Sequence, residues 1–287
     1  MMEKKAAARR STLVSVLVNV CLGTFQIIAG FFSGSQGLIA DGIHSLSDMV
    51  SDFVVLFANK HSSKDADEDH HYGHYRYETA ASLFIGISLV VVGAGMIWNV
   101  AVKIMEPDVT REIKLIALWI ALGGLVVKEL LFQYMIYVAK KVRSSMLIAN
   151  SWHARSDAAS SLVVSIGIIG ALYGYIIFDS IAALIVGFMI IKMGWNFSWD
   201  ALHDLMDRSV SGEEDKKITN IILATPGVKG CHDLKTRKMG DMILVDVHIE
   251  VDSNMSVKEG HDIAVAARRA VMEQMPVLNV MTHIDPI

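Results

Sequence analysis

Charged residues are scarce in this chain: only 20% of its 287 residues are Asp, Glu, Lys or Arg, against about a quarter in an average soluble domain. Cysteine is scarcer still, because Cys21 and Cys231 are the only two and form no CxxC pair, which excludes a disulfide framework. The net charge of −4 includes no basic surplus, so we expect no nucleic-acid partner. Apolar residues, in contrast, make up 53% of the chain, a composition typical of a membrane protein.

The apolar residues lie in blocks that are long enough to cross a lipid bilayer. A membrane-spanning helix needs about 20 mostly apolar residues. We predict such helices at residues 12–33, 37–59, 79–102, 113–139, 146–175 and 177–200. Residues 1–208 are therefore expected to form an all-α transmembrane domain of six helices.

The charges of the loops predict the orientation of these helices. Lys and Arg gather on the cytoplasmic side of short loops. Here they gather in the N-terminal tail and in the loops after spans two and four: Lys4, Lys5, Arg9, Arg10, Lys60, Lys64, Arg76, Lys140, Lys141 and Arg143. We therefore expect a multi-pass protein of the cell (inner) membrane with both termini in the cytoplasm.

Residues 209–287 have the pattern of a small separate domain. Ser211-Gly-Glu-Glu214 has the spacing of a capping box, and Ser256-Val-Lys-Glu259 repeats it at the start of a second helix. Met242–Val251 alternates apolar and polar residues, as a half-buried strand does. The order helix-strand-strand-helix-strand predicts a cytoplasmic α+β domain of the ferredoxin or metallochaperone type.

Two of the predicted spans carry a His and an Asp four residues apart. Ionisable residues cost about 2.5–3.5 kcal/mol each inside a membrane and are seldom accidental. Span two has four of them on one helical stripe, spaced three, four and four residues apart: Asp41, His44, Asp48 and Asp52. Span five has His153 and Asp157, again four residues apart. Each helix thus presents one imidazole and one carboxylate separated by a single turn.

If these two faces meet, they supply two nitrogen and two oxygen ligands, a set that suits tetrahedral Zn²⁺. The alternative is that each His–Asp pair only stabilises helix packing, but two identical pairs on separate spans favour a metal site. Asp41 and Asp52, at the ends of the stripe, either form an access path or lie near the water interface. Lys128 and Glu129 in span four suggest a salt bridge or gate, and we assign them no role.

Histidines also cluster outside the predicted spans. The loop between Lys64 and Glu78 holds His70, His71 and His74 among several carboxylates, and Gly73 allows the backbone to bring His70 and His74 together. The C-terminal domain holds four more histidines and a nearby carboxylate: His232, His248, His261, His283 and Asp285. The loop histidines can hold a divalent metal or belong to a solvated polar loop. Those of the domain either gather into one or two zinc sites or lie scattered on its surface.

Together these motifs resemble the cation diffusion facilitator family, and especially its bacterial zinc/iron-type exporters, over essentially the whole chain. The resemblance rests on both HxxxD pairs, the loop His70-His-Tyr-Gly-His74-Tyr-Arg-Tyr-Glu78, the segment Gly230-Cys-His232-Asp-Leu-Lys-Thr-Arg237 and the terminal His283-Ile-Asp285-Pro. One departure is His44, where many similar bacterial exporters have Asp. The His-Asp-His-Asp set looks like that of zinc-selective members.

The resemblance implies a homodimer in the lipid bilayer that exchanges a cytoplasmic divalent metal for protons. It also implies three metal sites. The transport site would be His44, Asp48, His153 and Asp157; the loop site would be Asp67, His70 and His74; and the cytoplasmic-domain site would be His232, His248, His283 and Asp285, with His261. Zn²⁺ would be both the transported ion and a structural one.

We therefore expect a Zn²⁺/H⁺ antiporter and not an enzyme. Metal binding requires neutral imidazoles and ionised carboxylates, so protons and metal compete for the same site. Two alternatives remain: efflux of Fe²⁺, Mn²⁺, Co²⁺ or Cd²⁺ by the same mechanism, and a membrane metal sensor or scaffold that transports nothing. An intramembrane metallohydrolase is disfavoured because catalytic zinc keeps a position open for water, and the chain has no HExxH motif.

Overall fold

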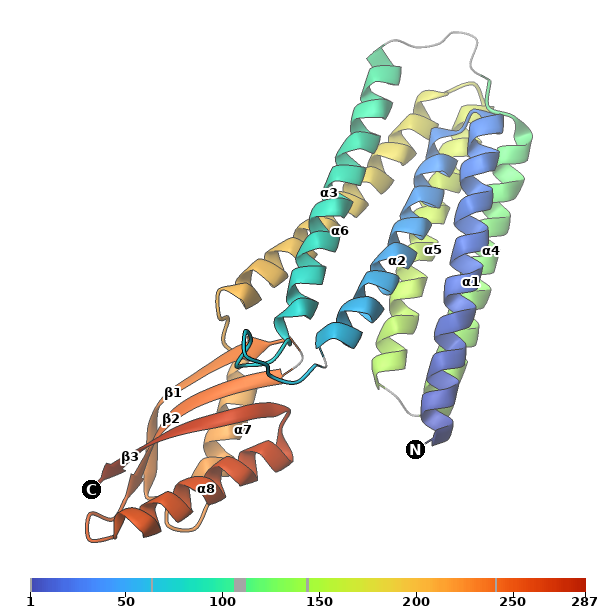
Figure 1. Cartoon of the computed structure of the whole chain (residues 1–287). Coiled ribbons are helices and arrows are strands. Elements are labelled where there is room, and N and C mark those ends of the chain that lie inside the picture. Colours follow the sequence, from blue (N-terminus) through green and yellow to red (C-terminus); the bar gives the residue numbers. More distant parts are fainter. Residues whose placement is uncertain (1, 63, 106–111, 143–144, 241) are drawn as a thin grey trace. The chain divides into compact units, whose positions relative to one another are not determined.

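The structure is a computed structural model that describes residues 2–62, 64–105, 112–142, 145–240 and 242–287, although the side chains of 2–12, 51–53, 55–60, 142, 145–150, 153 and 156 lie outside the description. Its elements, labelled in Figure 1, are α1 (Met2–Ser33), α2 (Gln36–Ser62), α3 (Arg76–Met105), α4 (Leu115–Val142), α5 (Ser145–Leu172), α6 (Ile177–Leu205), α7 (Gly212–Leu223), β1 (Gly230–Met239), β2 (Met242–Val251), α8 (Val257–Gln274) and β3 (Val277–Pro286). They form two compact units, one of Met1–Phe53 with Ile85–Asn196 and the other of Val54–Phe84 with Phe197–Ile287.

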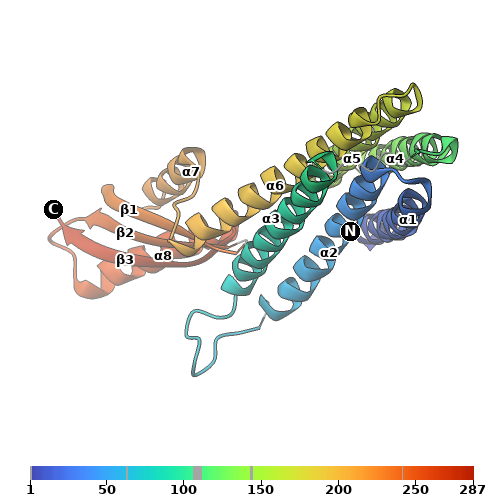
Figure 2. The same cartoon turned by 90° about the horizontal axis from the view of Figure 1, so that it is seen from above.

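The first unit is a bundle of long helices. In it α4 packs against both α5 and α1, and α2 lies beside them, while α3 runs alongside α6 (Figures 1 and 2). The predicted all-α transmembrane architecture is thus confirmed. Of the described residues, four stretches are long and apolar enough to cross a membrane, in α1, α3, α4 and α6.

The helices α2 and α5 are not among those four, so the described residues supply fewer apolar spans than the six predicted. The longest described stretches of side chains in these two helices, 36–50 in α2 and Asp157–Leu172 in α5, are shorter than a membrane span. Both stretches carry ionisable residues: Asp41, His44 and Asp48 in α2, and Asp157 in α5. These side chains lower the hydropathy of their helices, and Asp41 and His44 are buried inside the protein, at 0% and 4% exposure. Ionisable residues in membrane proteins typically face the bundle interior in this way.

Glycines allow α3 and α6 to approach each other closely. A Cβ atom added at Gly194 of α6 would lie 2.6 Å from the carbonyl oxygen of Gly86 in α3. One added at Gly93 of α3 would lie 2.7 Å from Cγ1 of Ile191. Small residues at such contacts drive helix association in membranes, where the hydrophobic effect between helices is absent.

The Gly194→Ala variant is therefore expected to be less stable than the wild-type protein. The new methyl group meets backbone rather than a flexible side chain, and overpacking of this kind costs about 1–3 kcal/mol. Gly95→Ala in α3 is the matched control, because a Cβ at Gly95 has no neighbour within 4 Å and Ala favours a helix over Gly by up to about 1 kcal/mol. Thermal unfolding in detergent should give a lower melting temperature for Gly194→Ala alone. Equal melting temperatures for the two variants would contradict the close approach.

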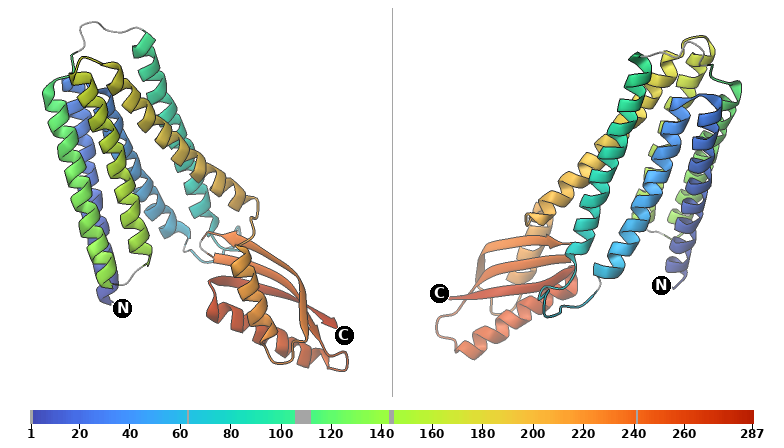
Figure 3. Two further views of the ribbon diagram at one scale, coloured as in Figure 1. Left: turned by 180° about the vertical axis from the view of Figure 1, so that it is seen from behind. Right: turned by 45° about the horizontal axis from the view of Figure 1, so that its top comes forward.

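The second unit contains a three-stranded sheet in the order β1-β2-β3, with β1 antiparallel and β3 parallel to β2. Helices α7 and α8 cover one face of this sheet (Figure 3), and a single apolar core joins them to it. Both predicted capping boxes are present, at Ser211 and Ser256. The predicted strand alternates as expected: Val245, Val247 and Ile249 are buried on the helix side. The predicted α+β domain is confirmed.

Candidate metal sites

The first candidate site lies between α2 and α5 and is formed by His44, Asp48 and Asp157. Nδ1 of His44 lies 3.8 Å from an oxygen of Asp48, and Nε2 of His44 lies 3.8 Å from an oxygen of Asp157. One ligand atom from each residue lies within 4.8 Å of the others. Ligands of a tetrahedral zinc ion with bonds of about 2.0–2.1 Å are separated by about 3.4 Å. A small shift of these side chains would therefore bring all three onto one ion.

Two other residues predicted for this region, His153 and Asp52, have side chains outside the described part of the chain. His153 belongs to α5, one turn before Asp157. Three of the four predicted transport ligands thus come together, and the fourth stays a prediction.

Asp41 occupies a buried ion pair, and the interpretation that it lies near the water interface stays a prediction. Nζ of Lys128 in α4 lies 2.9 Å from an oxygen of Asp41, and the two side chains are only 2% and 1% exposed. Sequence reasoning assigned Lys128 no role, although a lysine inside a span signals a partner on a neighbouring helix. Its neighbour Glu129 points elsewhere and accepts a hydrogen bond from Gln133. A pathway role for Asp41 or Asp52 stays a prediction.

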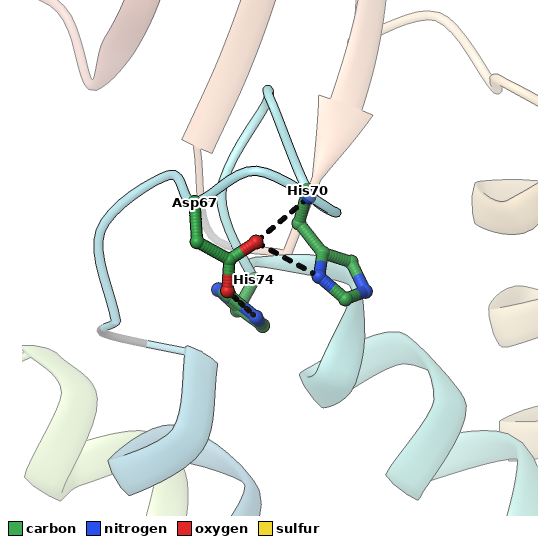
Figure 4. Close-up of side chains that lie close together, drawn as sticks. All are labelled: Asp67, His70 and His74. Atoms are coloured by element: carbon green, nitrogen blue, oxygen red, sulfur yellow. Dashed lines mark hydrogen bonds and ion pairs between the residues drawn. The ribbon is translucent and has the colours of Figure 1, made fainter.

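The second candidate site is in the loop between α2 and α3, where Asp67 lies between two imidazoles (Figure 4). Its two carboxylate oxygens lie 3.2 Å from Nδ1 of His70 and 3.3 Å from Nε2 of His74. Gly73 has a positive φ of 79°, a backbone conformation that glycine adopts readily, and this turn brings His70 and His74 together. The predicted loop ligands are thus neighbours.

The environment of Asp67 favours its ionised form, which is the form that binds metal. Partial loss of water contact raises the pKa of this carboxyl group, but the hydrogen bonds donated by the backbone and ring of His70 and the charge of His74 outweigh it. The pKa of Asp67 therefore falls below its ordinary value. Asp67 is available as an anionic ligand at neutral pH.

The third candidate site lies on the sheet, on the face opposite α8. The strand register places His248 of β2 beside His232 of β1 and His283 of β3. Nδ1 of His248 lies 2.9 Å from Asp285, and Nε2 of His232 lies 3.4 Å from the same carboxylate. The ring centroids of His248 and His283 are 4.6 Å apart. Three neighbouring strands thus bring their imidazoles around one carboxylate.

Two residues at this third site differ from expectation. His261 is exposed on α8, and no cluster of close ligand atoms among the described residues includes it. The reason is that α8 packs on the core side of the sheet, whereas His248 is on the other face. Glu250, which sequence reasoning missed, lies 3.2 Å from Nδ1 of His232. Its position two residues after His248 on the polar face of β2 was the available signal.

A helical bundle with a buried imidazole–carboxylate cluster, followed by an α+β domain with clustered metal ligands, defines a membrane protein that handles metal cations. Residues 12–206 match the cation efflux transmembrane domain, and residues 210–287 match the cytoplasmic domain of cation efflux proteins. The chain therefore belongs to the cation efflux, or cation diffusion facilitator, family. Members of this family are multi-pass membrane transporters of metal cations.

Individual relatives cover nearly the whole chain. An uncharacterised transporter of Methanocaldococcus jannaschii is 37% identical over 273 residues, 95% of this chain and 96% of its own. The manganese efflux system protein MneS of Bacillus subtilis is 32% identical over 96% of this chain and 94% of its own. A crystal structure of the cytosolic domain of a cation diffusion facilitator family protein is 26% identical, covering 26% of this chain and 90% of its own with a TM-score of 0.25.

Proposed function

We propose that the protein exports Zn²⁺ from the cytoplasm in exchange for protons. The transport site is His44 and Asp48 of α2 with His153 and Asp157 of α5. The observation that carries the proposal is the 3.8 Å approach of His44 Nε2 to Asp157 across two helices. These two residues are 113 positions apart, and such a pairing inside a bundle of membrane helices supplies an imidazole and a carboxylate to one point.

The ligand chemistry favours zinc as the cargo. Two imidazoles and two carboxylates match the nitrogen and oxygen ligands that tetrahedral Zn²⁺ accepts, whereas Mn²⁺ favours oxygen ligands. A relative that is 32% identical is named as a manganese efflux protein, which makes Mn²⁺ the second candidate cargo. The imidazole of His44 distinguishes these two candidate ions, because a nitrogen ligand suits Zn²⁺ better than Mn²⁺.

Competition between protons and metal couples the two fluxes. His44 binds metal only as a neutral imidazole, and His titrates near neutral pH. Protons that arrive from the outer side convert His44 and His153 to imidazolium ions, which repel the metal, and metal from the cytoplasm displaces protons in return. The exchange needs no ATP site, because the proton gradient supplies the free energy.

The other two sites serve the cytoplasmic side of the proposed transporter. The positive charges of the loops and of the N-terminal tail support an orientation in the inner membrane with both termini in the cytoplasm. The C-terminal domain forms the contact between two chains of a homodimer, and its zinc ions are structural or regulatory. This assignment is supported by the match to the cytoplasmic domain of the family.

Transport by purified protein in proteoliposomes tests the antiport. With a zinc-sensitive dye and a pH-sensitive dye inside the vesicles, zinc entering the lumen is expected to expel protons, and an imposed acidic lumen is expected to accelerate zinc entry. Mn²⁺ in place of Zn²⁺ is expected to give a slower signal. Zinc entry that neither uses nor dissipates a pH gradient would contradict the proposal.

The sheet site gives a separate prediction, for Asp285→Ala. This carboxylate contacts both His232 and His248, so its loss is expected to remove one class of bound Zn²⁺ and its stabilising effect. A ligand at 100 times its Kd stabilises a fold by about 2.7 kcal/mol. Calorimetric titration of the full chain with Zn²⁺, followed by thermal unfolding, measures both effects. Asp246→Ala, which removes an exposed carboxylate of the neighbouring strand β2, is the control, and identical titrations of the two variants would contradict the site.

A further inference from the structure

We propose that Lys128 of α4 is a positioning residue of the membrane metal site, which it holds in shape through Asp41 without binding the metal. This inference rests on the proposed transport site. Lys128 is among the largest fully buried side chains of the described residues, and its ammonium group lies 2.9 Å from Asp41. Burying two charges is expensive even when they pair, and a hydrophobic pair would often be at least as stable. Stability alone therefore does not explain why the chain buries the Lys128–Asp41 ion pair.

The carboxylate of Asp41 is fully engaged by groups from three other helices. One oxygen accepts hydrogen bonds from Lys128 and, at 2.8 Å, from Ser160 of α5. The other accepts from Ser161 of α5 and from Gln26 of α1, both at 2.6 Å. Asp41 thus joins α1, α2, α4 and α5 at one point.

The same groups hold the backbone of a metal ligand. The carbonyl oxygen of Asp157 lies 3.4 Å from Nζ of Lys128 and 2.7 Å from the hydroxyl of Ser160. The single hydroxyl proton of Ser160 serves Asp41 or Asp157 at any moment, whereas the ammonium group has three protons and can serve both. Lys128 therefore ties the turn of α5 that carries Asp157 to the turn of α2 that carries Asp41.

This connection lies one helical turn from the metal ligands on α2. Asp41 precedes His44 by three residues, so the two side chains lie on the same stripe of α2. Fixing Asp41 against α5 fixes the register in which His44 meets Asp157, whose atoms are 3.8 Å apart. Groups that orient metal ligands without touching the ion change metal affinity by about 10–100-fold when removed.

Lys128 also sets the charge of the region. Asp41, Asp48 and Asp157 are three carboxylates within two turns of α2 and the facing turn of α5, and Lys128 neutralises the first of them. Two carboxylates with neutral imidazoles remain, a charge that matches a single divalent cation. Without Lys128, the site would carry an additional negative charge beside its ligands.

The test uses the full chain in detergent, with Zn²⁺ as the probe, in a background of Asp67→Ala and Asp285→Ala so that the membrane site alone is titrated. Lys128→Met is expected to lower the melting temperature, because it leaves Asp41 buried without its counter-ion. It is also expected to lower the Zn²⁺ affinity, because the ammonium group no longer links Asp41 to the carbonyl oxygen of Asp157. The double variant Asp41→Asn with Lys128→Met removes both charges. It is expected to regain the melting temperature while its affinity stays about 10–100-fold weaker.

Ser160→Ala keeps the test valid if the charge variants fail to fold, because it removes a link between Asp41 and Asp157 without changing any charge. Its affinity is expected to fall about tenfold. Ser165→Ala is its matched control, since Ser165 is buried in the same helix and its described hydrogen bond goes to the carbonyl oxygen of Ser161. The inference would be overturned if the double variant bound Zn²⁺ with wild-type affinity, or if the two serine variants bound it with equal affinity. The Lys128–Asp41 pair would then only stabilise helix packing. Asp157→Ala tests the proposed transport site separately from the role of Lys128. If this variant still binds Zn²⁺ at wild-type affinity, the transport site itself is wrong.

Discussion

Replacing Asp157 with alanine is expected to reduce metal transport more than about 100-fold. The substitution removes one of two anionic ligands, and even partners that only orient a ligand change metal affinity by about 10–100-fold. It also leaves His44 without the carboxylate that faces its Nε2 at 3.8 Å. Zinc uptake into proteoliposomes, normalised to the amount of folded protein, measures the effect.

Glu129→Gln is the matched control for Asp157→Ala. Glu129 is another carboxylate in a membrane helix, but its described contact is a hydrogen bond from Gln133, outside the metal cluster. Its substitution is expected to leave the transport rate within about twofold of wild type, because surface polar changes cost little. Equal transport by both variants would remove the membrane site from the mechanism and favour a sensor or scaffold that binds metal elsewhere.

The second large effect is expected from His44→Asp, which should change the selectivity of transport. An aspartate at this position exchanges an imidazole nitrogen for a carboxylate oxygen and makes the site richer in oxygen ligands, which Mn²⁺ prefers. The ratio of Zn²⁺ to Mn²⁺ transport is expected to fall about tenfold or more, an effect of about 1.4 kcal/mol or more. Competition between the two ions in the same vesicle assay measures the ratio.

His71→Asp provides the control for this selectivity change. It makes the same chemical exchange at an exposed loop position that belongs to none of the metal clusters among the described residues. Its Zn²⁺ to Mn²⁺ ratio is expected to equal that of the wild-type protein. A His44→Asp variant with the wild-type ratio would show that selectivity is decided outside the ligand set.

Features that depend on neighbouring residues could be predicted from the sequence. The capping boxes at Ser211 and Ser256 need only a serine and a glutamate three positions later. The alternating burial of β2 follows from the two-residue period of a strand. The single stripe of Asp41, His44 and Asp48 follows in the same way from the period of a helix.

Features that depend on which faces meet could not be predicted in this way. The partner of Lys128 is 87 positions away on another helix. Both residues are recognisable in the sequence as ionisable groups, but their pairing depends on how the helices are arranged in the bundle. We predicted that His261 joins the histidines of the sheet. That prediction was wrong because the spacing of residues along α8 does not show which face of the sheet this helix covers. The contact between Glu250 and His232 required the antiparallel register of β1 and β2.

The sequence by itself determined that this is a membrane protein with an α+β domain, because hydropathy, helical period and capping are local properties that act along the chain. Its short motifs, which are local as well, carried the resemblance to metal-cation transporters. Tertiary structure alone decided that the imidazole of His44 reaches the carboxylate of Asp157, that Lys128 neutralises Asp41, and that one face of the sheet gathers its histidines. These contacts join residues far apart in the chain, so they depend on how helices and strands pack against one another.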